Sequence, residues 1–391
     1  MIDTIIVGLG AMGSAAAYQL ARRGKKVLGL EQFNPVHDMG SSYGRSRMIR
    51  QAYWESPAYV PILLRAYELW QELERSTQTK LLHITGGLAI GPESSELVSG
   101  CVHSARKYNL RHEILDHTQI RRRFPPLIAK SGEIGLYEFM AGYLIPEECI
   151  RQQLNQAVRY GAELHFKETV QSMEVDDSKQ EITIRTAKRT YHAEHLIISG
   201  GAWAPNILAN LALPLTVTRQ VMFWFDPIGG VAPFLPDRFP VYMFVPEPDY
   251  ILYGFPSIDG RNGGVKIAIH GSDEICSASS IDRKIRQEDL DRIRSRVAIR
   301  VPSLNGPLVK AHPCMYTMTP DENPIICQHP HFPSVSIAAG FSGHGFKMAS
   351  VIGEILADLV LDGTTRHDIS LFSIRRFAGQ CVQNNVQSHE S

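Results

Sequence analysis

Lys266 and His270 are the first pair of residues whose spacing could serve chemistry. The segment 264–271 alternates like a β-strand, so Lys266, Ala268 and His270 share one face. The two basic groups would then stand about 13 Å apart with only the small Ala268 between them. The two basic groups could then border a ring system from two sides, with the hollow between them. The alternative is an edge strand whose polar face is turned to solvent.

A second set of basic residues, Arg47, Arg50 and Lys347, could bind an anion. Arg47 and Arg50 are three residues apart, which predicts that they lie on one side of a helix or an irregular turn. Lys347 stands at the start of the last strongly helical stretch, where its charge opposes the helix dipole. This placement is favourable if an anion is held there. A solvated basic surface, and a lysine that bends into water, are the alternatives.

The six cysteines are scattered, and no two of them form a Cys-x-x-Cys pair. Cys314 lies in Ala311-His-Pro-Cys-Met-Tyr-Thr317, and a lone cysteine is more often an inert buried side chain than a reactive group. Cys327, His329 and His331 are too closely spaced, with no fourth partner, to predict a metal site. We therefore expect reduced thiols and no metal.

The elements that would position these groups begin at the N-terminus. An apolar strand, Thr4–Val7, leads into Gly8-Leu-Gly10-Ala-Met-Gly13, then a helix, and then a second strand that ends at Glu31. Glycines at these positions permit a tight turn and close approach to a pyrophosphate at the helix N-terminus. Glu31 is placed to bind ribose hydroxyls and would repel a ribose phosphate. The pattern predicts a dinucleotide site that disfavours NADP.

Two further strands run into glycines, near residues 200 and 340, while residues 217–270 read as short strands broken by Pro, Asp and Gly. The nucleotide lobe is therefore predicted to be discontinuous, which favours FAD over NAD. We expect an α/β fold with a Rossmann-like FAD-binding lobe and a mixed, mostly antiparallel β-sheet substrate lobe. The expected boundaries are 1–85, 145–215 and 320–391 for the FAD-binding domain, and 86–144 and 216–319 for the substrate domain.

Composition excludes several classes of partner. The chain has 391 residues, with 40 basic and 40 acidic side chains. This balance predicts no nucleic-acid partner and no anionic membrane surface. A strand that begins by residue 4 leaves no room for a signal peptide, and no apolar run approaches a membrane span. We therefore expect a cytoplasmic protein.

Taken in order, these pieces resemble the family of monomeric sarcosine oxidases and N-methyltryptophan oxidases, which includes pipecolate oxidases. The resemblance runs nearly end to end. Its most specific segments are Gly8–Gly13, Gly40–Tyr53, Tyr253–Pro256, Lys266–His270, Cys314–Glu322 and Ala339–Lys347.

This resemblance implies FAD bound through a thioether to Cys314, and oxidation of a secondary amino acid to an imine, with molecular oxygen reduced to hydrogen peroxide. It implies that Arg50 and Lys347 bind the substrate carboxylate and that Lys266 favours the reduction of oxygen. The remaining implied site residues are His270, Tyr253 and Tyr316 in the substrate pocket, Arg47 near the flavin, and Gly343 and His344 in the loop beside it. The family also implies a monomer.

One position departs from the family pattern, because Tyr43 stands where members usually have His. This departure concerns the rate of flavin attachment. Two other functions stay open: a flavin dehydrogenase that uses an acceptor other than oxygen, and a non-enzymatic flavin-holding subunit. The particular amino acid also stays open, since sarcosine, N-methyltryptophan, pipecolate and proline all present an amine and a carboxylate. Pocket size decides among them, with lining expected around Met222–Phe225, Tyr242–Phe244 and Met318.

Overall fold

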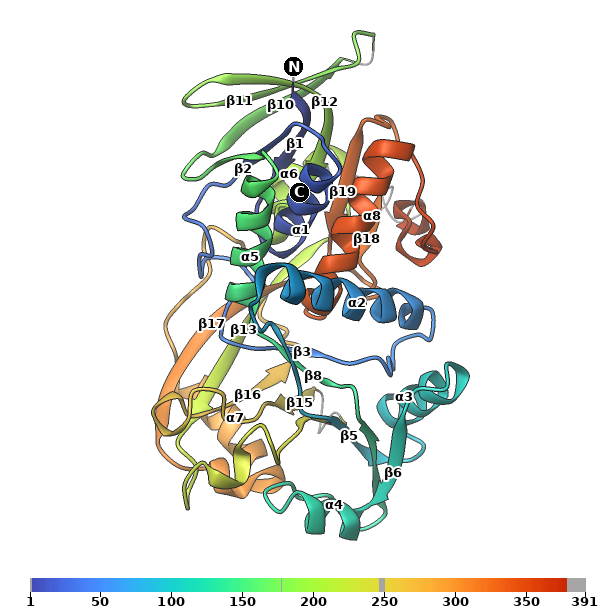
Figure 1. Ribbon diagram of the computed structural model, residues 1–391. Coiled ribbons are helices and arrows are strands. Elements are labelled where there is room, and N and C mark those ends of the chain that lie inside the picture. Colours follow the sequence, from blue (N-terminus) through green and yellow to red (C-terminus); the bar gives the residue numbers. More distant parts are fainter. Residues whose placement is uncertain (1, 177, 246–249, 378–391) are drawn as a thin grey trace, which may run out of the picture.

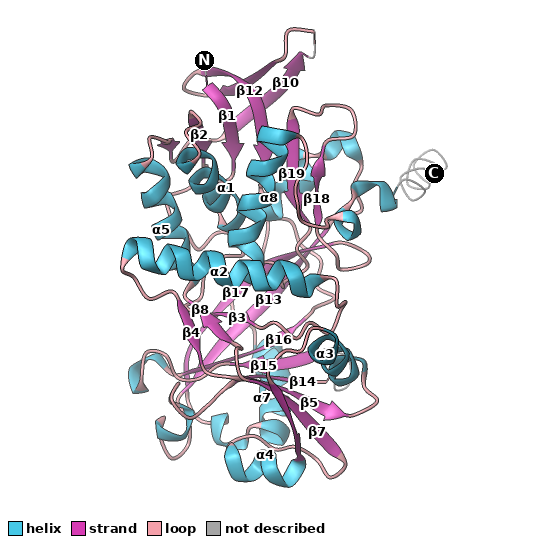
Figure 2. Cartoon of the chain, turned by 45° about the vertical axis from the view of Figure 1, so that its right-hand side comes forward, coloured by secondary structure: helices cyan, strands magenta, loops and turns pink. Residues whose placement is uncertain are grey.

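The computed structural model describes residues 2–176, 178–245 and 250–377. Two large β-sheets lie at opposite ends of the molecule, and α2 (Tyr59–Thr77) crosses between them (Figures 1 and 2). The elements of each sheet come from separate stretches of the chain. The functional groups far apart in the sequence can therefore meet where the two sheets face each other.

The first sheet carries the dinucleotide motif. Its strands run in the order β10-β11-β12-β1-β2-β9, and β19 and β18 extend it beside the second half of β12. The strands are β1 (Ile2–Val7), β2 (Val27–Leu30), β9 (Glu163–His165), β10 (Val170–Asp176), β11 (Glu181–Thr186), β12 (Thr190–Ile198), β18 (Ile325–Gln328) and β19 (Val335–Ala339). The central pairings β12–β1, β1–β2 and β12–β19 are parallel. The three predicted transitions from a strand into glycines therefore all lie at the C-terminal ends of these parallel strands, on the same side of the sheet.

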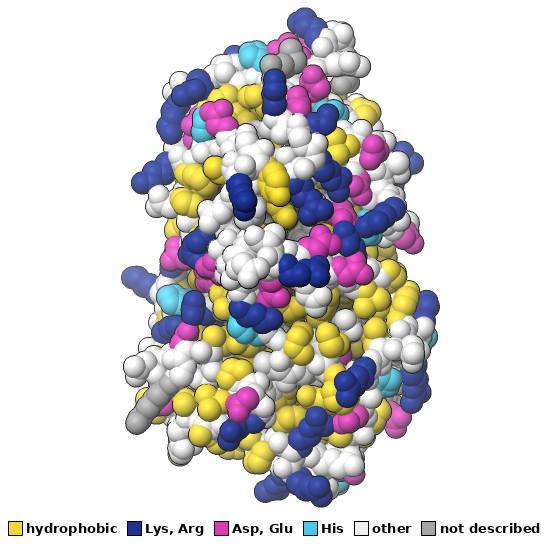
Figure 3. Space-filling model, viewed as in Figure 1, with side chains coloured by type: hydrophobic (Ala, Val, Ile, Leu, Met, Phe, Trp, Pro, Cys, Tyr) yellow, Lys and Arg dark blue, Asp and Glu magenta, His cyan; other side chains and the backbone are white. Residues whose placement is uncertain are grey.

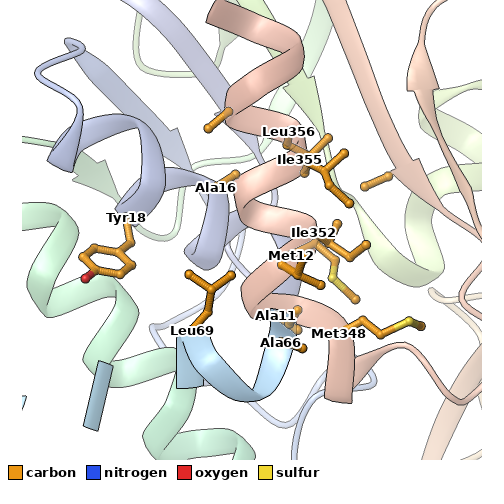
Figure 4. Packing of buried hydrophobic residues seen from close by; sticks show 14 of the residues in the cluster. Ala11, Met12, Ala16, Tyr18, Ala66, Leu69, Met348, Ile352, Ile355 and Leu356 are labelled. Carbon is orange, nitrogen blue, oxygen red and sulfur yellow. The ribbon is translucent and has the colours of Figure 1, made fainter. Parts of the chain in front are cut away.

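Three helices cover this sheet: α1 (Ala11–Arg22), α5 (Pro146–Arg159) and α8 (Ala349–Asp362). Small residues let α1 and α8 approach closely, and an added Cβ at Gly353 would lie 2.5 Å from Ala15. Ala16, Met12, Ile352 and Ile355 fill the contact, with Ala66 of α2 beside them (Figure 4). This packing fixes the N-terminus of α1 against the end of β19 and the segment after it.

The second sheet is mixed and mostly antiparallel, as predicted. Its order is β17-β13-β16-β15-β14-β5-β7-β6, and only the β14–β5 pair among these ladders is parallel. The strands are β5 (Gly87–Pro92), β6 (His112–Asp116), β7 (Glu133–Glu138), β13 (Thr216–Phe225), β14 (Val241–Phe244), β15 (Ile251–Gly254), β16 (Val265–His270) and β17 (Leu308–Met318). Because β16 lies between β13 and β15, it is an interior strand, and the edge-strand alternative for Lys266 is wrong.

The antiparallel β14–β15 pair is a hairpin among the short strands expected over residues 217–270, and its connection, Pro246–Asp249, lies outside the described residues. The remaining helices of this half are α3 (Glu96–Lys107), α4 (His117–Arg123) and α7 (Gln287–Arg300), and the short α6 (Ala204–Ile207) follows β12.

A small third sheet joins the two halves and corrects one prediction. It consists of β3 (Arg47–Ile49), β8 (Gly142–Leu144) and β4 (Leu82–Ile84). Arg47 therefore lies in a strand and Arg50 directly follows it, so the helix or turn predicted from their spacing is wrong. The reason is nonlocal, since the backbone of Arg47–Ile49 pairs with β8 rather than with itself. The expected domain boundaries stay predictions.

On the face shown in Figure 3, basic and acidic side chains are interspersed, in keeping with the zero formal net charge. Among the described residues, no helix has both the length and the apolar character that a membrane crossing needs. In the same residues, His, Cys, Asp and Glu side chains do not gather in threes that could hold a metal ion.

Candidate flavin and substrate site

A cavity of about 890 Å³ opens at the edge of the first sheet where the three glycine transitions meet. Its lining comes from all three, and includes Gly8, Gly10, Ser199, Gly340 and Gly343. The volume lies at the upper end of the range of about 300–1,000 Å³ that is usual for cofactor sites.

The glycines of the first transition form a cradle for a pyrophosphate. A Cβ at Gly13 would lie 1.8 Å from the Gly8 carbonyl oxygen, so only glycine allows α1 to pack on β1 here. A Cβ at Gly10 would meet nothing within 4 Å, and Gly10 caps α1 without a side-chain hydrogen bond. The N-terminal end of α1 therefore faces the cavity at Ala11 and Met12, where an anion would be stabilised. These features fit the diphosphate of FAD.

Glu31 lines the same cavity at the end of β2. Its carboxylate accepts hydrogen bonds from the backbone N–H groups of Leu9, at 2.9 Å, and Phe33, at 3.1 Å. Burial alone would raise the pKa of Glu31, but His37 and the Leu9 amide lower it below its usual value. The side chain is therefore ionised and fixed in place, as a ribose-binding carboxylate must be.

A second, smaller cavity of about 70 Å³ adjoins the first. Four residues, Arg47, Tyr316, Gly343 and Phe346, line both. The further lining of the small cavity includes Arg50, Glu55, Met222, Met243, Tyr253, His270, Cys314, His344 and Lys347. The structure thus brings together residues of β3, β13, β15, β16, β17 and the segment that follows β19.

The expected lining from the inserted lobe needs one correction. Met222 and Met243 line the small cavity as expected. Phe223, Phe225 and Phe244 instead belong to the hydrophobic core on the other side of the second sheet. Successive side chains of a strand point to opposite faces, so a whole segment cannot line one cavity.

Arg50 and Lys347 meet in the small cavity although they are far apart in the sequence. Arg50 Nη2 lies 3.0 Å from Glu55 Oε2, and Lys347 Nζ donates to the His344 carbonyl at 2.6 Å. Although burial works against its charge, the Glu55 carboxylate raises the pKa of Arg50 above its usual value. Burial and the charge of Arg50 lower the pKa of Lys347 to about 7. Glu55 therefore pairs with Arg50 and also interacts electrostatically with Lys347.

Lys266 is buried directly behind the cavity wall. Its Nζ donates to the carbonyl oxygens of Gly44 and Ser46, each at 2.9 Å, and it lies over the rings of Trp224 and Phe255. Ser46 lines the small cavity, whereas Lys266 is not among the described residues that line either cavity. Burial and the charge of Arg47 lower its pKa well below the usual value for lysine.

The two histidines of the site are neutral. Burial lowers the pKa of His270 to about 3 and that of His344 to about 4. His270 Nδ1 lies 3.3 Å from the Tyr316 hydroxyl, and the His270 ring is packed edge-on against Tyr253. Tyr253, Tyr316 and His270 thus form one wall of the small cavity.

Cys314 lies on β17, is buried and lines the small cavity. The loop before β3 holds both flanking peptide groups: the Tyr43 hydroxyl donates to the Pro313 carbonyl, and Ser41 Oγ donates to the Met315 carbonyl at 2.6 Å. Burial raises the pKa of Cys314 and also that of Tyr43. Tyr43, the residue that departs from the family pattern, therefore contacts the segment that carries the candidate attachment point.

Glu55 and Tyr53 are the two residues that sequence reasoning missed. Glu55 is the partner of Arg50, and Tyr53 lies beneath the cations. The available signal was an acid five residues after a candidate anion-binding arginine. That signal is weak, because an acid this close in sequence can equally face solvent.

Comparison with known families identifies the class to which this site belongs. The family described as "FAD dependent oxidoreductase" matches residues 3–359. The chain belongs to this family.

Among its relatives, a monomeric sarcosine oxidase of Streptomyces avermitilis is 47% identical, with 96% of this chain and 98% of that protein covered. An N-methyl-L-tryptophan oxidase of Salmonella dublin is 34% identical, with 96% and 99% covered. These findings confirm the resemblance predicted from the sequence and the use of FAD.

Two solved structures confirm the fold. NikD, an unusual amino acid oxidase essential for nikkomycin biosynthesis, has a TM-score of 0.83 at 23% identity, with 95% of this chain and 96% of that chain covered. An L-proline dehydrogenase from P. horikoshii has a TM-score of 0.83 at 22% identity, with 96% and 98% covered.

Proposed function

We propose that this protein is an FAD-dependent oxidase of secondary amino acids that converts the amine to an imine and reduces oxygen to hydrogen peroxide. The observation that carries the proposal is the small cavity, with Arg50 and Lys347 at its wall, that adjoins the large glycine-lined cavity. The names of the relatives, sarcosine oxidase and N-methyl-L-tryptophan oxidase, agree with it.

The role of the chain's own residues is to bind and orient the substrate. Arg50 and Lys347 hold the carboxylate, which fixes the position of the amine relative to the large cavity. His270 and Tyr316 are neutral, so the wall they form favours an uncharged amine. FAD, when bound, supplies the two-electron oxidation itself. Met222 and Met243 are flexible apolar residues that set the size of the group the cavity admits.

For the cofactor, we propose that Gly8, Gly10, Gly13, Glu31, Gly343 and His344 hold FAD and that Cys314 binds it covalently. Cys314 is buried next to Tyr316, which lines both cavities. Arg47 also lines both and belongs beside the attachment point. Lys266 is buried behind the wall, where it donates to the Gly44 and Ser46 carbonyls, and in its protonated form it stabilises the anion that forms as oxygen is reduced.

The experiment that tests the function is anaerobic mixing of the holoenzyme with sarcosine, N-methyl-L-tryptophan, L-pipecolate and L-proline. Loss of flavin absorbance with at least one of them is the expected result. Reduced enzyme is then mixed with air, and rapid formation of hydrogen peroxide supports the oxidase. Reoxidation over minutes would favour the dehydrogenase alternative, and no bleaching with any of the four would contradict the proposal.

A monomer in the cytoplasm stays a prediction. Sedimentation of the holoenzyme at several concentrations tests the first part, and fractionation of the source cells tests the second.

A further inference from the structure

The ring of Tyr53 lies beneath both cations of the small cavity. Arg50 Cζ is 4.3 Å from its centroid, and Lys347 Nζ is 5.2 Å from it. Tyr53 itself is fully buried, and among the described residues it is not one that lines either cavity. Any effect that it has on a bound molecule must therefore pass through neighbours that line the small cavity, namely Arg50, Lys347 and His344.

The Tyr53 ring is held on several sides. The Tyr59 ring stacks on the Tyr53 ring with 4.5 Å between their centroids. The hydroxyl of Tyr53 is hydrogen-bonded to His344 Nδ1. Its backbone carbonyl accepts a hydrogen bond from Ser104 of α3. Just before it, the Glu138 carboxylate of β7 accepts from the backbone N–H groups of Gln51 and Ala52. The ring is thus a rigid surface that both sheets help to position.

The charges around the small cavity explain how the Tyr53 ring could affect the site. Arg50 and Lys347 are both buried, Glu55 forms an ion pair with Arg50 and interacts electrostatically with Lys347, and the buried Glu138 also interacts with the charge of Arg50. An excess of positive charge in a buried place is costly unless something stabilises it. The face of an aromatic ring does so without neutralising the charge, and the effect grows when water is excluded. A second carboxylate at Tyr53 would have cancelled the charge that a substrate anion needs.

We propose that Tyr53 is a positioning residue that keeps Arg50 and Lys347 charged and correctly spaced, and so sets the preference of the site for a carboxylate over a neutral group. This inference rests on the proposed function, because it assumes that the two cations bind the substrate carboxylate. The hydroxyl bond to His344 orients the ring, whereas the ring face carries the effect on the cations.

The test compares two ligands that cannot be oxidised at an amine. Methoxyacetate carries a carboxylate, and methoxyacetamide has the same shape with a neutral amide. Each is titrated into the holoenzyme at pH 6, and dissociation constants are read from the change in flavin absorbance. The preference is the ratio of the two constants. Tyr53→Leu is expected to reduce this ratio about 10- to 30-fold, whereas Tyr53→Phe, which keeps the ring, is expected to change it less than about 3-fold.

Two further variants distinguish an effect of the Tyr53 ring on the cations from a general loss of stability. Phe234→Leu removes a buried aromatic side chain from the hydrophobic core of the second sheet, and among the described residues Phe234 lines neither cavity, so the expected result is a lower melting temperature with an unchanged ratio. Tyr53→pentafluorophenylalanine keeps the shape of Phe but reverses the charge distribution of the ring, so it is expected to lower the ratio relative to Tyr53→Phe by at least about 3-fold. This comparison stays decisive even if Tyr53→Leu does not fold.

If both Tyr53→Leu and the fluorinated variant keep the wild-type ratio, the inference about Tyr53 is overturned, and the proposed function is not affected. The same is true of an equal loss in Tyr53→Phe and Tyr53→Leu, which would assign the effect to the hydroxyl. If the wild type shows no preference for methoxyacetate, or if Arg50→Met and Lys347→Met keep that preference, the proposed carboxylate site fails as well.

Discussion

The carboxylate of Glu55 pairs with Arg50 at the small cavity, with Oε2 3.0 Å from Arg50 Nη2, and both residues line that cavity. Burial alone would raise the pKa of Glu55, but Arg50, His344 and Lys347 lower it. One of the chain's own carboxylates therefore offsets part of the positive charge at this site.

Replacing Glu55 by Gln should destabilise the protein and strengthen the binding of carboxylates. Loss of one partner leaves a buried guanidinium uncompensated, at a cost of about 3–5 kcal/mol in the free energy of unfolding. A bound carboxylate should restore part of this stability. Urea unfolding of Glu55→Gln with and without methoxyacetate measures both effects.

The matched control is Glu68→Gln, since Glu68 pairs with Arg65 at the surface. An exposed pair contributes at most about 1 kcal/mol, and no recovery by methoxyacetate is expected. Equal behaviour of the two variants would show that Glu55 does not compete with a ligand.

The affinity for methoxyacetate should fall as the pH rises through about 7. The pKa of Lys347 is lowered to about 7, so its charge is complete below that pH and is lost above it. His270 and His344, with pKa values of about 3 and 4, stay neutral throughout pH 5–9 and add no slope. Titrations at pH 5.5–9 in the wild type and in Lys347→Met check this. An unchanged slope in Lys347→Met would assign the titration to another group.

Lys266→Met should slow reoxidation of the reduced enzyme by about 10²-fold or more and change the rate of reduction by less than about 10-fold. The reason is that its buried charge acts on the anion formed from oxygen and not on the amine. Stopped-flow measurement of the two half-reactions separates them. Lys310→Met is the control, because Lys310 lies over the same Trp224 ring at 4.8 Å but has no contact with Gly44 or Ser46. Equal slowing of both half-reactions would refute the role of Lys266.

Cys314→Ala should release the flavin on denaturation. Acid precipitation of the wild type is expected to give a yellow pellet, and that of Cys314→Ala a colourless pellet beneath a yellow supernatant. Cys276→Ala should behave as the wild type, because Cys276 is only half-buried and lines neither cavity among the described residues. A colourless pellet from flavin-loaded wild type would rule out the covalent link.

Two glycine variants should fail in different ways. In Gly13→Ala the new Cβ meets the Gly8 carbonyl at 1.8 Å, so the apoprotein itself should be destabilised. In Gly10→Ala the backbone angle is ordinary and nothing lies within 4 Å, so the apoprotein should keep its melting temperature but bind FAD weakly. Thermal unfolding of both apoproteins, followed by FAD titration, distinguishes them. Normal FAD affinity in Gly10→Ala would contradict the pyrophosphate cradle.

The sequence alone was sufficient wherever the information is local. The turn at Gly8–Gly13, the helix that follows it and the alternation along Lys266–His270 depend on hydrogen bonds and side-chain periodicity within a few residues. The family resemblance then related distant motifs to one another, and so placed Arg50, Cys314 and Lys347 in one site. Periodicity could not do this, because it carries no information on which elements dock together.

Only the tertiary structure decided which surfaces meet. It made β16 an interior strand, which buries Lys266, and it paired Arg47–Ile49 with β8, so that a strand stands where a helix or an irregular turn was predicted. It also placed Glu55 against Arg50. The Tyr53 ring lies beneath two cations, Arg50 from the N-terminal part of the chain and Lys347 from the C-terminal part. Arg50 and Glu55 are only five residues apart, so their pairing is local and depends on the irregular segment between them. The physical reason for the strand pairings and for the contact of Lys347 with Tyr53 is that they are long-range. They form only when both sheets and α2 pack together, and that packing is a property of the whole core.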